Sequence, residues 1–522
     1  MRLGWKEQSL ENATISEIQS APLSSIYQSV VRSAPELDYF EERDAKRKKA
    51  VSLWWELVAS SLSDSAIGRQ VTVEATMETV DECGRELLDA VFGLKSPNTL
   101  LKRFYSLKAY ADWCSKELLV QWLPIVETDV WSYMKWLKNT EAPPTKATSL
   151  MEAIRFGWYI IGFAGAGEVQ NSLRLKGISS QMFIKKKPWR PAALLEVKEI
   201  VLIHDFLEDV SKDLIDRVFA GHLLHLLYVR GRWSDLAAVQ HGEIDEDGQF
   251  LEFSTQHHKG AKGQEAKSRL LPLVAPCKGV TGTNWCKTYL DVREKAGLPL
   301  PQEVPLAMLL APARHCAMDW TSRALTSQEG TAFLRKLLGV PTDSDRRVST
   351  HSLKSTAISW CSKFGLCFES RALLSRHISA VSNPTALYSR DLISAVMREF
   401  CQVVEQIAKS RFEPDRTRSG MITPSGDLAN PATPIGPSSA SRLVQDAFER
   451  GPSPIADNVE EDELAEEILG PFSKEALDRN EDVEQPDQEG LDMESSKKCS
   501  FEKELSETSE SDPSLCLHLI RR

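Results

Sequence analysis

Residues 350–391 read THSLKSTAISWCSKFGLCFESRALLSRHISAVSNPTALYSRD, which brings two histidines, a lysine and a tyrosine together in one short stretch. His351 is followed three residues later by Lys354, and His377 and Tyr388 come after them. Imidazole and ammonium groups can bind phosphate and transfer protons, and a phenol oxygen can attack phosphorus. The stretch therefore suggests phosphate chemistry.

The residues after His351 are predicted to form one amphipathic helix. Apolar residues recur there at three- and four-residue steps, and Gly365 follows them as a natural stop. His351 and Lys354 would project from one side of the first turn, where the helix N–H groups and dipole attract an anion such as phosphate. Taken alone, His351 is more simply explained as a residue that caps or packs the helix. The apolar positions are Leu353, Ala357, Trp360, Cys361 and Phe364.

The length of 522 residues predicts roughly two to four domains, because single hydrophobic cores rarely exceed about 250 residues. The ten cysteines show no CxxC pair and no spacing suited to a zinc site or a disulfide framework, so reduced thiols and no metal site are expected. No apolar run approaches the roughly 20 residues that span a bilayer, and the N-terminus lacks the apolar core of a signal peptide. We therefore expect an intracellular protein that does not enter a membrane.

The net charge of −11 is unevenly distributed along the chain. Between residues 457 and 512 acidic side chains exceed basic ones by 16, so the remaining residues carry a net charge of +5. This mild positive charge is compatible with DNA binding but not diagnostic of it. From about residue 412 onward, Pro, Ser, Gly and acidic residues dominate, so residues 412–522 are predicted to form a disordered acidic tail.

A helical domain is predicted at residues 95–180, after a partly helical N-terminal region at residues 1–90. Ser96 followed by Pro97 is a typical helix start. Three amphipathic helices are predicted, at residues 98–114, 128–139 and 145–165. Basic residues outside their apolar stripes fit a bundle that grips DNA, and the pattern fits a bundle without that role equally well. On the first helix these residues are Lys102, Arg103 and Lys108.

A basic segment with two prolines, KKKPWRP at residues 185–191, is the best predicted boundary between domains. A linker with this charge fits one that lies along a DNA phosphate backbone, and it is also compatible with plain solvation. Its lysines, predicted to contact DNA, are Lys185, Lys186 and Lys187. A second basic run at residues 46–49 fits either a nuclear localisation signal, if the source is eukaryotic, or a solvated basic face.

The second predicted domain spans residues 190–411 and is mainly helical. It continues through the sequence RGRWSDL at residues 230–236. Two runs at residues 248–258 and 268–274 then flank the glycine- and lysine-rich segment 259–263, which predicts a β-hairpin. The predicted fold class of the whole chain is therefore mainly α with a small β-hairpin or sheet.

These features resemble the tyrosine recombinases, the phage-integrase family that cuts and rejoins DNA through a phosphotyrosine. The resemblance covers roughly residues 95–410 and implies a helical core-binding domain followed by a catalytic domain. The family's first arginine lies between a glycine and a serine–acidic pair, and the segment from Gly231 to Asp235 is similar to this pattern. The residues that match the family's catalytic positions are Arg232, Lys259, His351, Lys354, His377 and Tyr388.

The resemblance implies how these residues would act on one phosphodiester. Arg232 and Lys354 would hold the non-bridging oxygens, and His377 would donate a further hydrogen bond. Tyr388 would attack phosphorus and form a 3′-phosphotyrosyl intermediate, which conserves the bond energy, so neither ATP nor a metal cofactor is needed. His351 would assist proton transfer.

The hairpin lysine would protonate the departing 5′-oxygen. Lys259 is predicted for this role, and Lys262, otherwise expected to contact DNA, is the alternative because the spacing permits either. By the same resemblance the chain would bind double-stranded DNA, act on paired sites as a homotetramer and derive from a mobile element.

The sequence departs from the family's pattern at two points. Lys354 stands where the family has a second arginine, which keeps the charge but loses the bidentate fork that suits phosphate. The interval between His377 and Tyr388 is longer than the usual one. Three alternatives stay open: a catalytically silent DNA-binding protein derived from a recombinase, a type IB topoisomerase, and a helical scaffold without a DNA role.

Overall fold

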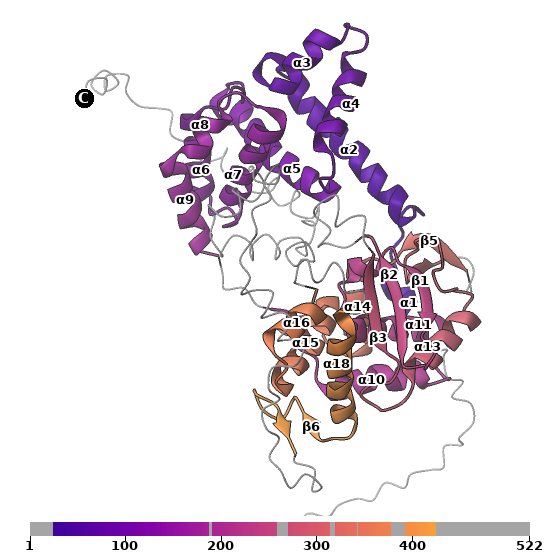
Figure 1. The fold of residues 1–522 in the computed structure, drawn as a ribbon. Coiled ribbons are helices and arrows are strands. Elements are labelled where there is room, and N and C mark those ends of the chain that lie inside the picture. Colours follow the sequence, from indigo (N-terminus) through magenta and orange to yellow (C-terminus); the bar gives the residue numbers. More distant parts are fainter. Residues whose placement is uncertain are drawn as a thin grey trace, which may run out of the picture. The chain divides into compact units, whose positions relative to one another are not determined.

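The computed structural model (Figure 1) describes residues 25–186, 191–257, 270–313, 319–341, 343–376 and 392–423. Within these residues, buried apolar side chains form two separate hydrophobic cores. One core lies among the helices between residues 39 and 184, which we call the helical bundle. The other is built by residues 25–32 and by residues after 190, which we call the sheet domain. Both are mainly helical, and the strands form small antiparallel sheets, as the predicted fold class requires.

The helical bundle is an array of short helices joined by tight turns. Its α-helices are α2 (Tyr39–Ala59), α3 (Ala66–Glu74), α4 (Val80–Phe92), α5 (Pro97–Trp113), α6 (Glu127–Asn139), α7 (Lys146–Phe156), α8 (Ala166–Asn171) and α9 (Leu173–Ile184). A short 3-10 helix and two π-helical turns connect them, η1 (Leu62–Asp64), η2 (Cys114–Leu118) and η3 (Gly157–Ile161).

The helix predicted after Ser96 is confirmed as α5. Ser96 Oγ accepts a hydrogen bond from Thr99 N at 3.2 Å, and Pro97 occupies the first helical position, where its missing N–H is no loss. Apolar residues at helical spacing along α5 are buried, namely Leu100, Phe104, Leu107 and Ala111, and α6 and α7 bury similar stripes. The three predicted helices therefore pack through their apolar faces, but the third, predicted to reach residue 165, ends as an α-helix at Phe156 and continues as the π-helical turn η3.

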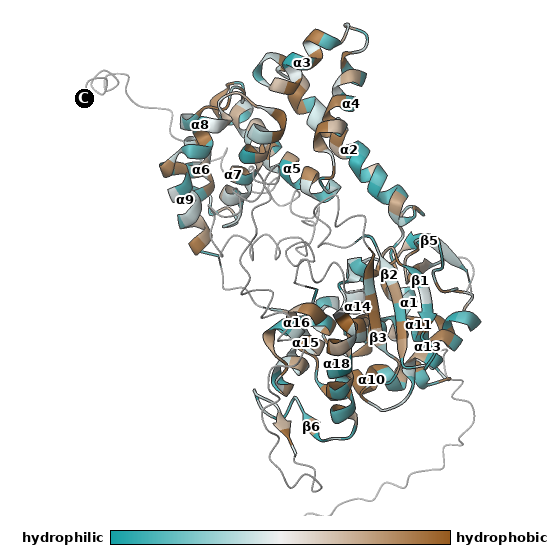
Figure 2. Ribbon diagram, viewed as in Figure 1, coloured by the Kyte–Doolittle hydropathy of each residue, from teal (hydrophilic) through white to brown (hydrophobic). Residues whose placement is uncertain are grey.

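The bundle begins earlier than the boundary predicted at residue 95. Trp54 of α2 is fully buried, and its Nε1 donates to Leu100 O of α5 at 2.9 Å. Gly84 of α4 lies so close to the ring of Trp55 that a Cβ atom there would come within 2.2 Å of it. Figure 2 shows the change along α2, whose first half is hydrophilic and whose second half is more hydrophobic. Residues 39–92 therefore belong to the bundle.

The sheet domain is organised around α11, which is buried from its second residue to its last. Its sequence is apolar on almost all sides, so it packs against α10, α13, α15 and β3 at once. The helices of the domain are α1 (Ile26–Val30), α10 (Val197–Glu208), α11 (Leu214–Val229), η4 (Trp233–Leu236), α13 (Trp285–Lys295), α14 (Ser327–Leu337), α15 (Thr350–Phe364), α16 (Phe368–Leu374) and α18 (Leu392–Ala408).

The main sheet has three antiparallel strands in the order β1-β2-β3. Phe250 lies opposite Pro276 and Thr255 opposite Leu271, so the predicted hairpin of β2 and β3 is confirmed. β1 is a third strand that the sequence pattern does not predict. Most of the connection between β2 and β3, residues 258–269 with Lys259 and Lys262, lies outside the described residues. The strands are β1 (Gln240–Ile244), β2 (Phe250–Thr255), β3 (Leu271–Pro276), β4 (Leu310–Pro312), β5 (Trp320–Ala324), β6 (Phe412–Glu413) and β7 (Met421–Ile422).

The first described residues belong to the sheet domain, although they precede the bundle in sequence. Asp216 of α11 accepts hydrogen bonds from Ile26 N at 2.6 Å and Tyr27 N at 2.7 Å, at the start of α1. Arg32 N donates to Glu329 of α14 at 2.8 Å. The chain therefore enters the sheet domain, builds the helical bundle and returns.

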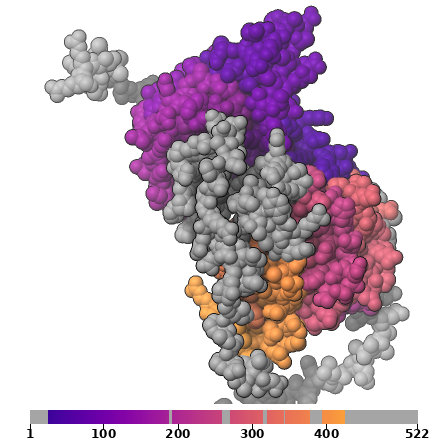
Figure 3. All heavy atoms as spheres, in the orientation of Figure 1, coloured from indigo at the N-terminus to yellow at the C-terminus, as the bar shows by residue number. Residues whose placement is uncertain are grey.

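The sheet domain also extends past the predicted start of the tail at residue 412. Phe412 is 1% exposed and packs against Phe364 of α15, and Asp415 accepts a hydrogen bond from Val197 N at the start of α10. The space-filling view shows the C-terminal elements in orange beside the magenta surface of the sheet (Figure 3). The prediction that folded structure ends at residue 411 is therefore wrong by about ten residues, since β7 ends at Ile422.

Among the helices that the structure describes, none combines the length and the apolar character that crossing a membrane requires.

Among the described residues of the sheet domain, three histidines are buried. Neither ring nitrogen of His225 has a hydrogen-bond partner within the described part of the chain, and its ring lies 5.1 Å from that of Phe253. Burial lowers the pKa of His225 to about 3 and that of His204 to about 4, and it also lowers the pKa of His222. These side chains are therefore neutral in the folded protein at neutral pH.

Mild acid is expected to destabilise the protein through these histidines. A histidine in the unfolded chain takes up a proton near pH 6.5, but these buried histidines do not. The free energy of unfolding therefore falls as the pH drops below about 6.5. Each histidine contributes a fall of about 1.4 kcal/mol per pH unit. His225→Leu removes one of these groups. Urea unfolding of this variant should therefore depend less steeply on pH between about pH 6 and pH 5 than that of the wild type. Equal slopes would contradict a neutral, buried His225.

Candidate active site

The start of α15 and the turn after α11 build the candidate active site. At the start of α15, Ser349 N donates to Ser352 Oγ at 3.1 Å. The helix ends before Gly365, whose φ of 99° favours glycine. The helix predicted after His351 is therefore confirmed, with its predicted apolar residues facing the core. His351 is half-buried on its first turn.

The turn after α11 presents Arg232. Arg230 ends the helix in the left-handed conformation, with φ at 52°, and Gly231 N donates back to Leu226 O at 3.3 Å. Arg232 N then donates to Asp235 Oδ2 at 2.9 Å, and Asp235 is fully buried. These backbone contacts fix the position from which the half-buried Arg232 side chain extends.

Lys354 lies close to this turn. It is 5% exposed, and its Nζ donates to Ser375 O, just after α16, at 3.1 Å. Burial, followed by the nearby positive charge of Arg232, lowers the pKa of Lys354 to about 7. The other charged groups that act on Lys354 are Asp235, which opposes this shift, and Arg376 and Arg230, which add to it. The structure therefore brings together two residues that the sequence keeps far apart.

Arg376 belongs to the same cluster, although the sequence pattern does not single it out. Its Nη1 donates to Arg230 O at 3.1 Å, and its Nη2 donates to Val229 O at 2.6 Å. Nη1 also lies 3.8 Å from Asp235 Oδ2. The one signal in the sequence that points to Arg376 is its position directly before His377.

Arg230 is a second arginine that sequence reasoning misses. Its side chain is fully buried, and its Nη2 lies 3.1 Å from both Val274 O of β3 and Met397 Sδ of α18. Its guanidinium lies 4.4 Å from the ring centroid of Phe400. Burial, and then the charge of Arg376, lowers the pKa of Arg230 to about 9. Among the described residues, its hydrogen-bond partners include no carboxylate.

The cluster carries more positive than negative charge. Among the described residues, the charges that act on Lys354 are those of three arginines and of one carboxylate, Asp235. Buried cations that outnumber their anions are costly, so the described part of this cluster favours an added anion.

Several predicted site residues lie outside the described part of the chain. They are Lys187, Lys259, Lys262, His377 and Tyr388. The structure does describe the residues that flank two of these segments. Arg376 directly precedes His377, and α18 begins at Leu392, four residues after Tyr388.

Arg103 is a correction among the residues predicted to contact DNA. The apolar stripe of α5 predicts that it lies on the outer face, but it is 9% exposed and forms an ion pair with Glu152 of α7. The prediction of an exposed Arg103 is wrong because α7 packs on that side of α5. Lys108 is exposed and pairs with Asp112 at 2.6 Å, and Lys102 is half-buried.

The described part of the basic linker begins directly after α9. Lys185 is exposed, and Lys186 Nζ lies 5.4 Å from the ring centroid of Phe183. Both lysines remain predicted DNA contacts.

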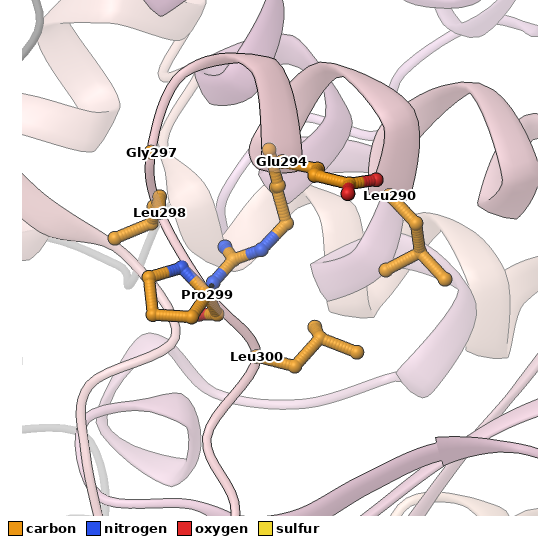
Figure 4. A pocket seen from close by; sticks show the side chains of 7 residues that line it. Leu290, Glu294, Gly297, Leu298, Pro299 and Leu300 are labelled. Carbon is orange, nitrogen blue, oxygen red and sulfur yellow. Dashed lines mark hydrogen bonds between the residues drawn. The ribbon is translucent and has the colours of Figure 1, made fainter.

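A separate pocket of about 450 Å³ lies beside the end of α13 and the loop that follows it. Figure 4 shows its apolar side chains, Leu290, Leu298, Pro299 and Leu300, with Glu294 at its edge. None of the predicted site residues lines it, so we do not assign it to the candidate active site. Among the residues that the structure describes, no group of three or more His, Cys, Asp or Glu side chains is arranged to hold a metal ion.

No protein-family model and no curated protein matches this chain. Among solved structures it is similar to a lambda integrase dimer bound to a COC′ core site, at 15% identity over 55% of this chain and 93% of that one, with a TM-score of 0.34. It is also similar to the Tn1549 transposon integrase in complex with circular intermediate DNA, at 10% identity over 60% of this chain and 98% of that one, with a TM-score of 0.35. A third similar structure is XerA recombinase, at 13% identity over 61% of this chain and 97% of that one, with a TM-score of 0.24. All three of these solved structures are of integrases or recombinases.

Proposed function

We propose that this protein cleaves and rejoins DNA strands through a covalent 3′-phosphotyrosyl intermediate, as a tyrosine recombinase does. The observation that carries the proposal is the convergence of Arg232 and Lys354 on one buried, cation-rich cluster. A phosphodiester resists attack because its anionic oxygens repel a nucleophile, and attack adds charge to those oxygens. Preorganised cations in a water-poor site lower that barrier.

Tyr388 is the proposed nucleophile. Its Oη would form a bond to phosphorus while the bond from phosphorus to the 5′-oxygen breaks, so the strand is cut and the phosphate stays on the enzyme. The tyrosine proton would pass to His351, and Lys259 or Lys262 would give a proton to the leaving 5′-oxygen. Attack by a free 5′-hydroxyl reverses these steps and rejoins the strand. His377 would hydrogen-bond a non-bridging oxygen.

Double-stranded DNA is the proposed partner of the whole chain. The exposed lysines of α5 and of the linker, Lys108 and Lys185, would contact phosphates beside the bundle. Recombination between two sites would require several protomers, and a homotetramer on paired sites is proposed by family resemblance. The same resemblance suggests a mobile element as the source of the gene.

A second candidate function is DNA binding without strand cleavage. The observation that favours it is Lys354, which replaces a bidentate guanidinium and whose pKa is lowered to about 7. A partly neutral amine binds a transition state less strongly than an arginine does. Such a protein would bind DNA in a salt-sensitive way and form no covalent adduct.

Trapping a covalent complex tests the proposed function. The full chain is incubated without metal with nicked suicide duplexes drawn from the DNA that flanks its gene, and an adduct that resists denaturant is sought. Binding of each duplex is measured in parallel as a function of salt. An adduct supports the proposed enzyme. Salt-sensitive binding without an adduct would favour the silent DNA-binding protein, and no binding at all would contradict both.

Strand cleavage is expected to slow as the pH rises through about 7. Lys354 is proposed to act as a cation. Because its pKa is about 7, the fraction of Lys354 that is charged falls from about nine tenths at pH 6 to about one tenth at pH 8. Cleavage rates measured below saturation, which report the free enzyme, should fall roughly tenfold over this range. In Lys354→Arg the guanidinium stays charged, so this decline should disappear. The same decline in both proteins would assign it to another group that acts in its protonated form, such as the hairpin lysine that protonates the 5′-oxygen.

A further inference from the structure

Arg376 closes the end of α11. The last carbonyls of a helix have no partner within the helix and need donors from elsewhere. Here the two terminal nitrogens of Arg376 donate to Val229 O and Arg230 O, at 2.6 and 3.1 Å. These two carbonyls lie directly before Gly231 and Arg232. The guanidinium group of Arg376 therefore holds the start of the turn that carries Arg232, the proposed phosphate-binding residue.

Arg376 also sits at the start of the segment that contains His377 and Tyr388. It adopts a left-handed conformation, with φ at 59°, which is unfavourable for an arginine and persists only where surrounding contacts enforce it. The residue before it, Ser375, accepts the hydrogen bond from Lys354. Residues 375–376 are thus attached to the end of α11 through the Arg376 side chain and to α15 through the Ser375 carbonyl.

The helix that follows this segment contacts the same turn. α18, which begins at Leu392, contacts the Arg230 side chain through Met397 Sδ at 3.1 Å and through the ring of Phe400. The turn after α11 is therefore held by the residues on both sides of the segment that carries the proposed nucleophile.

We propose that Arg376 is a positioning residue for strand cleavage, which holds the turn that carries Arg232 in one fixed arrangement. This inference rests on the proposed function. Arg376 is not assigned as a phosphate ligand, because its side chain is 7% exposed and both of its terminal nitrogens already donate to backbone carbonyls. It acts through Arg232, whose position decides whether the phosphate that Arg232 holds lies in line with the attacking oxygen.

Arg376→Lys tests this role, because lysine keeps the charge but cannot donate to two carbonyls as a planar fork. The variant should bind a suicide duplex as tightly as the wild type. Its single-turnover rate of adduct formation at saturating duplex should fall roughly 100-fold, the loss that a misplacement of about 1 Å causes. A purely structural role would lower thermal stability and leave the rate of the folded protein unchanged.

Arg323→Lys is the matched control. Arg323 is 8% exposed in the same domain, and its two terminal nitrogens each donate to Glu329 at 2.9 Å. The substitution therefore also removes a buried guanidinium group that makes two hydrogen bonds, but one outside the cluster around Lys354. It should lower the unfolding temperature without changing the cleavage rate. If Arg376→Lys does not fold at the assay temperature, Arg376→Gln replaces it, because its amide still donates to one of the two carbonyls.

The outcomes separate the inference from the proposed function. A wild-type adduct with an unchanged rate in the Arg376 variant would overturn the positioning role and leave the proposed function standing. An equal loss of rate in Arg323→Lys would also overturn it, since the effect would then be general destabilisation. No adduct from the wild type on duplexes that it binds would overturn the proposed function, and the inference with it.

Discussion

Replacing Tyr388 by phenylalanine is expected to abolish the covalent protein–DNA complex while leaving duplex binding intact. The substitution removes only the hydroxyl oxygen that would bond to phosphorus, and no other group on the ring can take its place. The positive charges that attract the backbone, at Arg232 and in the linker, are unchanged, so the affinity and its salt dependence should persist. The adduct is measured on denaturing gels with suicide duplexes, and binding is measured by titration.

Tyr159→Phe is the control for this experiment. Tyr159 is 63% exposed in the helical bundle and is not part of the candidate site, so this variant should form the adduct at the wild-type rate. An undiminished adduct in Tyr388→Phe would show that a different residue attacks the DNA. The long interval between His377 and Tyr388 would then be the first feature to reconsider.

Replacing Arg232 by alanine is expected to lower the rate of adduct formation by roughly 100- to 1,000-fold, the usual loss when one preorganised donor to a developing oxyanion is removed. The backbone of the turn should persist, because Arg232 N, not its side chain, donates to Asp235, and Arg376 holds the carbonyls before it. Arg232→Lys keeps the charge without the fork, so its rate should lie between those of the alanine variant and the wild type.

Single-turnover rates at saturating duplex give the measurement, with thermal unfolding to confirm that each variant is folded. Arg416→Ala is the control, since Arg416 is an exposed arginine of the same domain whose contact with Glu413 spans 3.4 Å. It should keep the wild-type rate. A loss in Arg232→Ala no larger than in Arg416→Ala would exclude Arg232 from the site.

The parts of the fold that depend on local pattern could be predicted from the sequence. α15 follows from apolar residues at helical spacing and a glycine stop, and the cap of α5 follows from Ser96 and Pro97. The β2–β3 hairpin follows from two apolar runs around a glycine-rich segment. In each case the residues that make the structure are close together in the chain, so their types and spacing carry the information.

The residues that the sequence could not place depend on contacts between distant segments. Arg103 looks exposed from the periodicity of α5, and only the packing of α7, with Glu152, makes it buried. Arg376 has no recognisable motif, and its role appears only when α16 ends beside the last carbonyls of α11. The early start of the bundle has the same cause, because Trp54 of α2 becomes core only against α5.

Identifying the residue that carries the DNA tests the central claim most directly. The wild-type adduct is digested with nuclease and trypsin, and peptides that retain a nucleotide are sequenced by mass spectrometry. Trypsin cuts after Arg376 and Arg390, which yields peptide 377–390 with Tyr388 as its single tyrosine. The account predicts a nucleotide on Tyr388 through its phenolic oxygen. A nucleotide on any other residue, or no modified peptide from duplexes that the protein binds, would contradict it.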